Sequence, residues 1–288
     1  MAALAIATLT TRFGFNWRIA FWIGACIAVV GSVARTRLRE TPEFVDMKLK
    51  LKLSIEECER ANPRKAEKLL KEVANFRKHK IPRLTLLSYF LIECGWPITF
   101  YLVYMYFNPT LKAVYHYTSE DIILHNFALS MIHVIQDIVW TVASLYFHPL
   151  KIVRMRTKVS LFLIVLVPVC LLFHVGVGAV FLLQALLLTF NTSGAPAQYV
   201  FIKQIPVYRR FTAISFTGAL GRALTYIITS FGMVFMTDWL GCYGTLFITL
   251  PVTISFLWAV KYFEKLERLK SDKSFFKPTD QITHGQAA

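Results

Sequence analysis

Three charged side chains lie alone within long apolar stretches of this sequence. Glu93 falls in the stretch 84–107, Asp137 in 122–147 and Arg222 in 212–236. A guanidinium stays charged at any working pH, and an ionised group in hydrocarbon is costly. Each group must therefore face protein, water or an opposite charge if its stretch crosses a bilayer. The pattern favours a membrane protein that handles a polar solute over a buried enzyme centre.

Glu93 belongs to a row of aromatic residues at helical spacing, which places them on one helix face. A carboxylate among aromatic rings is the chemistry that binds a quaternary ammonium group. The alternative is that the rings pack between helices and that Glu93 is protonated and hydrogen-bonded to a neighbour. The row consists of Tyr89, Glu93, Trp96, Phe100 and Tyr104.

The next apolar stretch carries an imidazole and a carboxylate on its polar face. His133 and Asp137 are four residues apart, so in a helix they can share a hydrogen bond. Such a pair below the headgroups is a candidate proton carrier. Asp137 has an alternative partner in Arg222, with which it would form an ion pair between two helices.

Three amide side chains recur at intervals of seven residues in the stretch 178–202, namely Gln184, Asn191 and Gln198. Seven residues make about two helical turns, so a continuous helix would carry the three amides as one slowly drifting stripe. The stripe either lines a solute path or supplies interhelical hydrogen bonds of about 0.6 kcal/mol each.

These residues must be positioned by membrane helices. Of the 288 residues 56% are hydrophobic, above the 45–50% typical of soluble domains. Each apolar stretch is close to the ~20 residues that cross ~30 Å of hydrocarbon. An additional stretch, 1–10, is too short to span and is expected to be the second half of a helix. The seven predicted spans are 17–34, 84–107, 122–147, 159–176, 178–202, 212–236 and 243–263.

The basic residues are distributed unevenly about these spans. If the segment 35–83 is cytoplasmic, alternating crossings place 28 of the 32 Lys and Arg residues on that side. This asymmetry follows the positive-inside rule and favours anionic lipid headgroups. The net charge of +15 therefore indicates membrane orientation, and nucleic acid is not an expected partner.

No cofactor or metal site is predicted. The five cysteines form no CxxC pair, and neither a nucleophile elbow nor a phosphate-binding loop occurs. We therefore do not expect an enzyme.

Two motifs resemble a known transporter family. The first is NWRIAF at 16–21 followed by RTRLRETPEF at 35–44, and the second is RFTAISFTG at 210–218. They resemble the end of helix 6 with the central loop, and the entry to helix 11, of the metabolite:proton symporters. This branch of the major facilitator superfamily includes the proline/betaine and 2-oxoglutarate permeases.

The resemblance implies an all-α membrane protein in which the seven spans correspond to helices 6–12. Residues 1–34 would be a remnant of the N-terminal bundle. Residues 35–83 would be a cytoplasmic linker with an amphipathic helix opening at Asn62, and 84–263 the C-terminal six-helix bundle. Residues 264–288 would be a cytoplasmic tail. Two departures are that the loop 148–156 lacks the Asp and Gly of the family signature, and that the tail lacks heptads.

The implied function is proton-coupled symport of a small osmolyte such as proline or betaine in a bacterial inner membrane, as half of a split or truncated transporter. Its partners would be the lipid bilayer, protons, a zwitterionic solute and a separate N-terminal half. Alternatives are a degenerate remnant that carries nothing or serves as an interaction partner, and a fragment of a dicarboxylate permease. Arg222, as the single cation away from the ends of the predicted spans, is a thin provision for two carboxylates. The path candidates are Glu93, Trp96, Tyr104, His133, Asp137, Gln184, Asn191, Gln198 and Arg222.

The charge distribution predicts that Cys58 faces the cytoplasm and Cys242 the opposite side. A membrane-impermeant thiol reagent applied to intact cells should label Cys242 and spare Cys58, because only the first is exposed outside. Permeabilised cells, in which both should react, are the control. The reverse pattern would contradict the predicted orientation.

Overall fold

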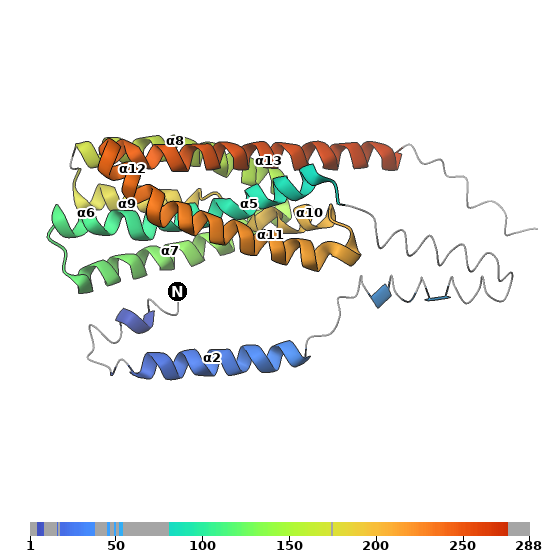
Figure 1. Cartoon of the computed structure of the whole chain (residues 1–288), viewed down its shortest axis with the longest axis horizontal. Helices are drawn as coiled ribbons and strands as arrows, with labels where there is room; N and C mark the ends of the chain where they lie inside the picture. The colour runs from blue at the N-terminus through green and yellow to red at the C-terminus, as the bar shows by residue number, and fades with distance from the viewer. Residues whose placement is uncertain are drawn as a thin grey trace, which may run out of the picture.

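The computed structural model describes residues 5–8, 16, 18–37, 45–46, 49, 52–53, 81–173 and 175–275. Every regular element within these ranges is helical, which confirms the all-α prediction (Figure 1). The amphipathic helix predicted to open at Asn62 and the predicted tail beyond residue 275 lie outside the described residues.

The long helical stretches are assembled from several elements. A π-helical turn, Leu102–Tyr106, joins α5 to α6, and a second one, Ile228–Gly232, joins α11 to α12. Short 3-10 turns, Ala195–Ala197 and Gly241–Tyr243, precede α10 and α13. The helices are α2 (Arg18–Arg37), α5 (Arg83–Tyr101), α6 (Phe107–Ala113), α7 (Ser119–Tyr146), α8 (Pro149–Leu172), α9 (Val177–Thr189), α10 (Gln198–Lys203), α11 (Val207–Ile227), α12 (Met233–Leu240) and α13 (Gly244–Phe275).

Local sequence signals account for where several helices begin. Thr118 caps α7 in a reciprocal arrangement: its hydroxyl accepts from the Asp121 amide at 3.2 Å, and the Asp121 carboxylate accepts from the Thr118 amide at 3.1 Å. Pro149 opens α8, where a proline costs nothing because the first amides of a helix have no intrahelical partner. These signals set the entry points of α7, which carries His133 and Asp137, and of α8, which carries Arg156.

Four helical stretches among the described residues are long and apolar enough to cross a membrane, judged by length and composition. The last of them contains two predicted spans and reverses direction at Gly241, whose φ of 59° and ψ of −144° favour glycine. Two other predicted spans coincide with shorter apolar helices, Phe21–Ala34 and Val177–Thr189. The four stretches are Arg83–Ala113, Ser119–Tyr146, Pro149–Leu172 and Val207–Leu269.

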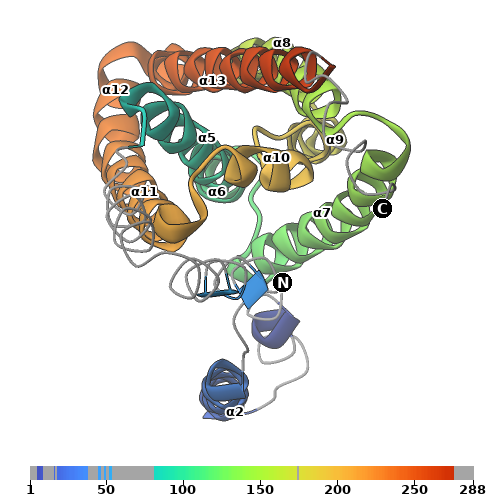
Figure 2. The same cartoon turned by 90° about the vertical axis from the view of Figure 1, so that its right-hand side faces the viewer.

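Helix α5 occupies the centre of the bundle. It packs against α11 on one side and α13 on another, while α8 packs against both α13 and α9, and α7 against α9. Viewed from its end, the bundle has α5, α6, α9 and α10 inside an outer ring of α7, α8, α11 and α13, with α2 standing apart (Figure 2). Most side chains of α2 that the structure describes are exposed.

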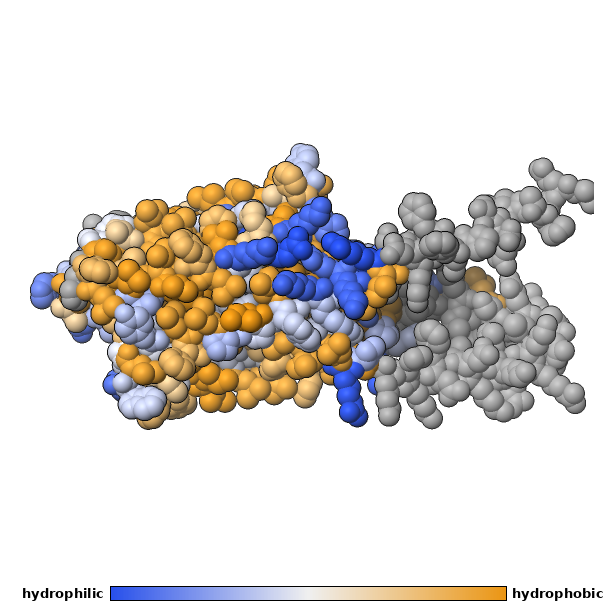
Figure 3. Space-filling view, turned by 90° about the horizontal axis from the view of Figure 1, so that it is seen from above, coloured by the Kyte–Doolittle hydropathy of each residue, from blue (hydrophilic) through white to orange (hydrophobic). Residues whose placement is uncertain are grey.

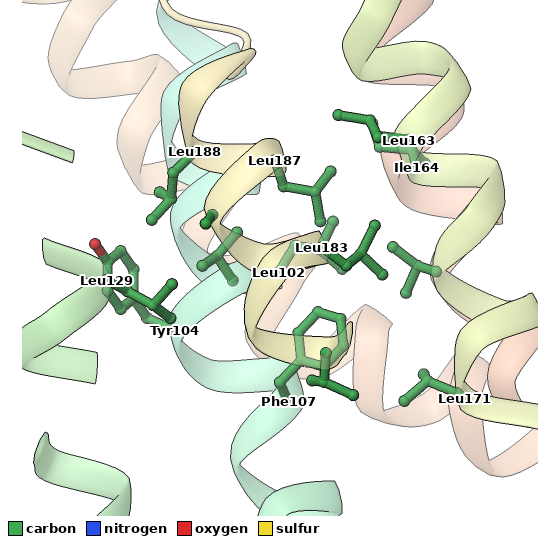
Figure 4. Packing of buried hydrophobic residues seen from close by; sticks show 14 of the residues in the cluster. Leu102, Tyr104, Phe107, Leu129, Leu163, Ile164, Leu171, Leu183, Leu187 and Leu188 are labelled. Atoms are coloured by element: carbon green, nitrogen blue, oxygen red, sulfur yellow. The ribbon is translucent and has the colours of Figure 1, made fainter. Parts of the chain in front are cut away.

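Two large apolar clusters, and a smaller one of Ile98, Met233 and Ile248, hold the described part of the bundle together. The first joins α6 and its π-helical turn to α7, α8 and α9, with Phe107, Leu129, Leu163 and Leu187 among its members (Figure 4). The second joins α5, α8, α10, α11 and α13, and its largest side chains include Phe201, Phe256 and Phe263.

The outer surface of the bundle is also apolar. Large hydrophobic side chains stay exposed along the outer helices, and Figure 3 shows an apolar band with hydrophilic residues gathered at one end. A monomeric soluble protein rarely exposes apolar patches of more than a few hundred Å². Together with the long apolar helices, this surface indicates a membrane-embedded protein. Examples on two helices are Ile135, Ile138 and Val142 of α7, and Phe216, Leu224 and Phe231 of the α11 stretch.

Two predicted segment boundaries are wrong. The predicted span 159–176 belongs to α8, which begins ten residues earlier at Pro149, so the basic residues assigned to a loop lie within a helix. The predicted continuous span 178–202 is interrupted, because α9 ends at Thr189 and α10 begins at Gln198. Gly194 and Pro196 occupy this break, and proline cannot donate the backbone hydrogen bond that would continue the helix.

Gly95 permits the closest approach of α5 to its neighbours. A Cβ at this position would lie 2.3 Å from the Thr192 carbonyl oxygen and 2.7 Å from Cδ2 of Phe256. Both neighbours are themselves buried, so the added methyl group has no space to enter.

We expect Gly95→Ala to lower the free energy of unfolding by about 1–3 kcal/mol, the usual cost of overpacking. Denaturant unfolding of the protein in detergent, followed by circular dichroism, measures this. Gly178→Ala is the matched control, since a Cβ there meets nothing within 4 Å. Equal stability of the two variants would contradict the close packing.

Candidate functional site

A cavity of about 360 Å³ lies where α5, α11 and the break between α9 and α10 meet. This volume is within the ~300–1,000 Å³ range of small-molecule sites. Four of the nine predicted path residues line it: Glu93, Trp96, Gln198 and Arg222. The remaining lining residues are Ile92, Pro97, Ser193, Gly194 and Ala195.

Two of the lining side chains, a carboxylate and a guanidinium, form an ion pair. Arg222 Nη2 lies 3.7 Å from Glu93 Oε2, and the exposed fraction of the side chain is 64% for Arg222 and 14% for Glu93. Gly221 of α11 allows α5 to approach closely at Glu93, since a Cβ on Gly221 would lie 3.3 Å from the Cβ of Glu93. The pair is therefore built on a close contact of α5 with α11, with Arg222 reaching out of it.

Gln198 closes the cavity from α10. Its Nε2 donates to the Tyr89 hydroxyl at 2.8 Å and lies 3.5 Å from Glu93 Oε1. Tyr89 is fully buried. The amide thereby ties α10 to α5 beside the acid.

Trp96 connects the cavity with a second polar cluster on α7. Its indole stacks on the His133 imidazole with 4.8 Å between ring centroids, and His133 Nε2 lies 3.5 Å from Asp137 Oδ2. Gln136 also donates to Asp137 Oδ1 at 3.1 Å. The predicted contact of His133 with Asp137 is confirmed, whereas Arg222, the alternative partner, lies beside Glu93.

The predicted stripe of three amides is wrong, because the helix that would carry it is broken. Gln184 is buried against α7 and the π-helical turn that follows α5, accepting from His125 Nε2 and donating to the Val103 carbonyl, both at 2.8 Å. Asn191 lies within the break, and Gln198 lies at the cavity. The three amides serve three separate places.

Tyr104 is another predicted path residue that does not line the cavity. It is 6% exposed and belongs to the apolar cluster that contains Leu129, as Figure 4 shows. Its ring packs against Phe100 at 5.2 Å between centroids. For the rings of Phe100 and Tyr104, the structure supports the alternative that they pack between helices.

Sequence reasoning missed Arg156, which it assigned to a cytoplasmic loop. Arg156 is 1% exposed and is the largest fully buried side chain among the described residues. Its Nη2 donates to Asn191 Oδ1 at 2.6 Å, and its guanidinium lies 5.2 Å from the centre of the Trp140 ring. A signal was present in the apolar helical spacing of Ile152, Val153, Arg156, Leu163 and Val167, which places the arginine on the buried face of α8.

Within the described parts of the chain, no three His, Cys, Asp or Glu side chains gather as metal ligands would. The polar groups that face the cavity are a carboxylate, a guanidinium, an amide, a hydroxyl and an indole. Such a set can bind a small charged solute through ion pairs, hydrogen bonds and a cation–π contact.

Comparisons with family models, curated proteins and solved structures give no match to this chain. The resemblance to the metabolite:proton symporters thus stays a prediction.

We expect Tyr89→Phe to lower the free energy of unfolding by about 1 kcal/mol, because it removes a buried hydrogen-bond partner of Gln198 without removing the ring. Denaturant unfolding in detergent checks this value. Tyr243→Phe is the control, since Tyr243 is exposed. A Tyr89→Phe protein as stable as this control would show that the hydroxyl contributes nothing.

Proposed function

We propose that this chain is one part of a proton-coupled carrier that takes up a small zwitterionic osmolyte, such as proline or betaine, across a bacterial inner membrane. The observation that carries the proposal is the cavity where Glu93, Arg222, Gln198 and Trp96 meet inside an apolar helical bundle. Intramembrane charges that face a cavity are characteristic of solute and ion pathways.

The geometry of the cavity fits a solute that carries both charges. The cationic end would lie against Glu93 and the face of Trp96, where a cation–π contact is worth about 0.5–2 kcal/mol. The carboxylate end would pair with Arg222, whose planar guanidinium suits bidentate binding. Glu93 and Arg222 are only 3.7 Å apart and pair with each other. On binding, the cationic end of the solute would replace Arg222 as the partner of Glu93, and its carboxylate would replace Glu93 as the partner of Arg222. Each of the two side chains would thus keep an opposite charge beside it.

Protonation of an acid at this level supplies the coupling. Glu93 and Asp137 are the candidates, since each lies within an apolar stretch. A change of charge on either alters the relative stability of two conformations, and a proton gradient can thereby drive accumulation.

The carrier would consist of two helical bundles, as alternating access requires. We infer seven crossings for this chain, corresponding to helices 6–12 of the superfamily, with the linker and the C-terminus in the cytoplasm. The second bundle would cover the side on which Arg222 is exposed. A separate N-terminal half is the partner we expect.

A dicarboxylate carrier and a non-transporting interaction partner are the alternatives. The cavity lining contains one cation, Arg222, which provides for one carboxylate. Arg156 does not supply a second cation for a solute carboxylate, since it is fully buried and already hydrogen-bonded to Asn191.

Solute binding by the purified chain in nanodiscs tests the proposal without the second bundle. Betaine or proline should change the tryptophan fluorescence in a saturable manner, because Trp96 lines the cavity. Trp96→Phe should remove this change, whereas Trp258→Phe, on α13 and away from the lining residues, should retain it. If 2-oxoglutarate binds and neither betaine nor proline does, a dicarboxylate carrier is favoured. If none of the three solutes binds, a non-transporting interaction partner is favoured.

We expect Glu93→Gln to abolish pH-driven uptake while the protein still inserts, because the amide keeps the shape and loses the titratable charge. Uptake of labelled betaine into vesicles with an imposed proton gradient measures this, in the presence of a candidate N-terminal half. Glu120→Gln, in the first turn of α7 outside the cavity, is the matched control. Normal accumulation by the Glu93→Gln protein would remove Glu93 from the coupling step.

A further inference from the structure

The wall of the cavity opposite α5 is made of chain that is not α-helical. Helix α9 ends at Thr189 and the 3-10 turn begins at Ala195. Ser193, Gly194 and Ala195 from this break line the cavity. A broken helix inside an apolar bundle leaves backbone groups without their intrahelical partners, so side chains from neighbouring helices must satisfy or restrain them.

Helix α5 holds one side of the break. The Thr192 hydroxyl donates to the Gly95 carbonyl at 3.0 Å and lies 2.8 Å from the Thr99 hydroxyl. Gly194 also fits closely here, since a Cβ would lie 2.7 Å from Cγ2 of Ile92. These contacts fix the break against the helix that carries Glu93.

Arg156 holds the other side from α8. Its Nη2 donates to Asn191 Oδ1 at 2.6 Å, and Asn191 Nδ2 in turn donates to the Leu188 carbonyl at 2.7 Å, at the end of α9. Trp140 of α7 donates to the Thr189 carbonyl at 2.8 Å and presents its ring to the guanidinium at 5.2 Å. Arg156 and Trp140 thus restrain Asn191 and Thr189, two residues apart at the point where the helix stops.

Packing alone does not explain an arginine at this position. A fully buried guanidinium carries a large desolvation penalty, and an apolar residue of similar volume is often no less stable. The Nε of Arg156 also has no hydrogen-bond partner among the described residues, which adds to the cost. The charge is therefore retained at the expense of stability, as is common where a residue orders a functional segment.

We propose that Arg156 is a positioning residue of the solute cavity: through Asn191 it holds the break between α9 and α10 in the form that builds the cavity wall. The proposal rests on the proposed function for the identity of the solute. The restraint on the wall is a property of the chain itself.

The test is the reactivity of a cysteine placed in the wall. Ser193→Cys is introduced into the chain in nanodiscs, and the labelling rate of the introduced thiol by a hydrophilic reagent is followed by mass spectrometry. We expect Arg156→Gln to raise this rate about tenfold, since a charged hydrogen bond that restrains the segment is lost. Asn191→Ser leaves the buried charge in place and should produce a similar increase in the labelling rate. It replaces Arg156→Gln in the test if that variant does not fold.

Two controls separate a local effect from general loosening. Arg154→Gln removes another arginine of α8, one that pairs with Glu264 at 2.9 Å, and should leave the rate at the introduced thiol unchanged. Cys94 is buried in the bundle, so its labelling reports general unfolding and should stay slow in every variant. An unchanged rate at the introduced thiol in Arg156→Gln and Asn191→Ser, or a parallel rise at Cys94, would overturn the proposal.

Protection of the introduced thiol by a solute tests the proposed function separately from the role of Arg156. Betaine should slow labelling of the introduced thiol in the Ser193→Cys chain, and should do so about tenfold less effectively when Arg156→Gln is added, since the wall is less ordered. If betaine and proline give no protection at all, the proposed function is wrong. The dependence of the labelling rate on Arg156 still decides whether this residue positions the wall.

Discussion

The need to satisfy every polar group within an apolar bundle is the constraint on which this structure depends. Hydrocarbon offers no hydrogen bonds, so a helix can stop inside the bundle only where side chains bind the freed backbone groups. The break after Thr189 meets this condition through Trp140 and Asn191, whose side chains donate to the carbonyls of Thr189 and Leu188. Residues of the same break, Ser193, Gly194 and Ala195, form part of the cavity wall.

Polar residues in the helices divide into two kinds by the partners they find. Many threonines donate to the carbonyl four residues earlier in their own helix, as Thr225, Thr249 and Thr253 do at 2.7–2.8 Å. These hydroxyls are satisfied locally and report nothing about function. The second kind finds partners on other elements, as Glu93, Gln198 and Arg156 do. These three lie around the cavity and its wall.

The charged groups lie at different places around the cavity. Glu93 and Arg222 lie in the cavity and are suited to meet a solute. His133 and Asp137 lie behind Trp96, connected to the cavity through a stacked ring. Arg156 lies behind the wall that the break forms, within electrostatic reach of Asp137 and His133. Under the proposed function, a solute that displaced Trp96 or the break would act on these clusters through direct contacts, and the proposed coupling of solute to proton would use them.

The sequence by itself determined the helical class, the membrane environment and which charges must be sheltered, because apolar length and isolated charge are local properties of the chain. It also predicted the contact of His133 with Asp137, since a spacing of four residues suffices within one helix. Only the tertiary structure decided that Arg222 lies beside Glu93, that the three amides serve three places, and that Arg156 is buried. Each of these depends on which helices pack together and on where a helix breaks, and both follow from contacts between residues far apart in the chain.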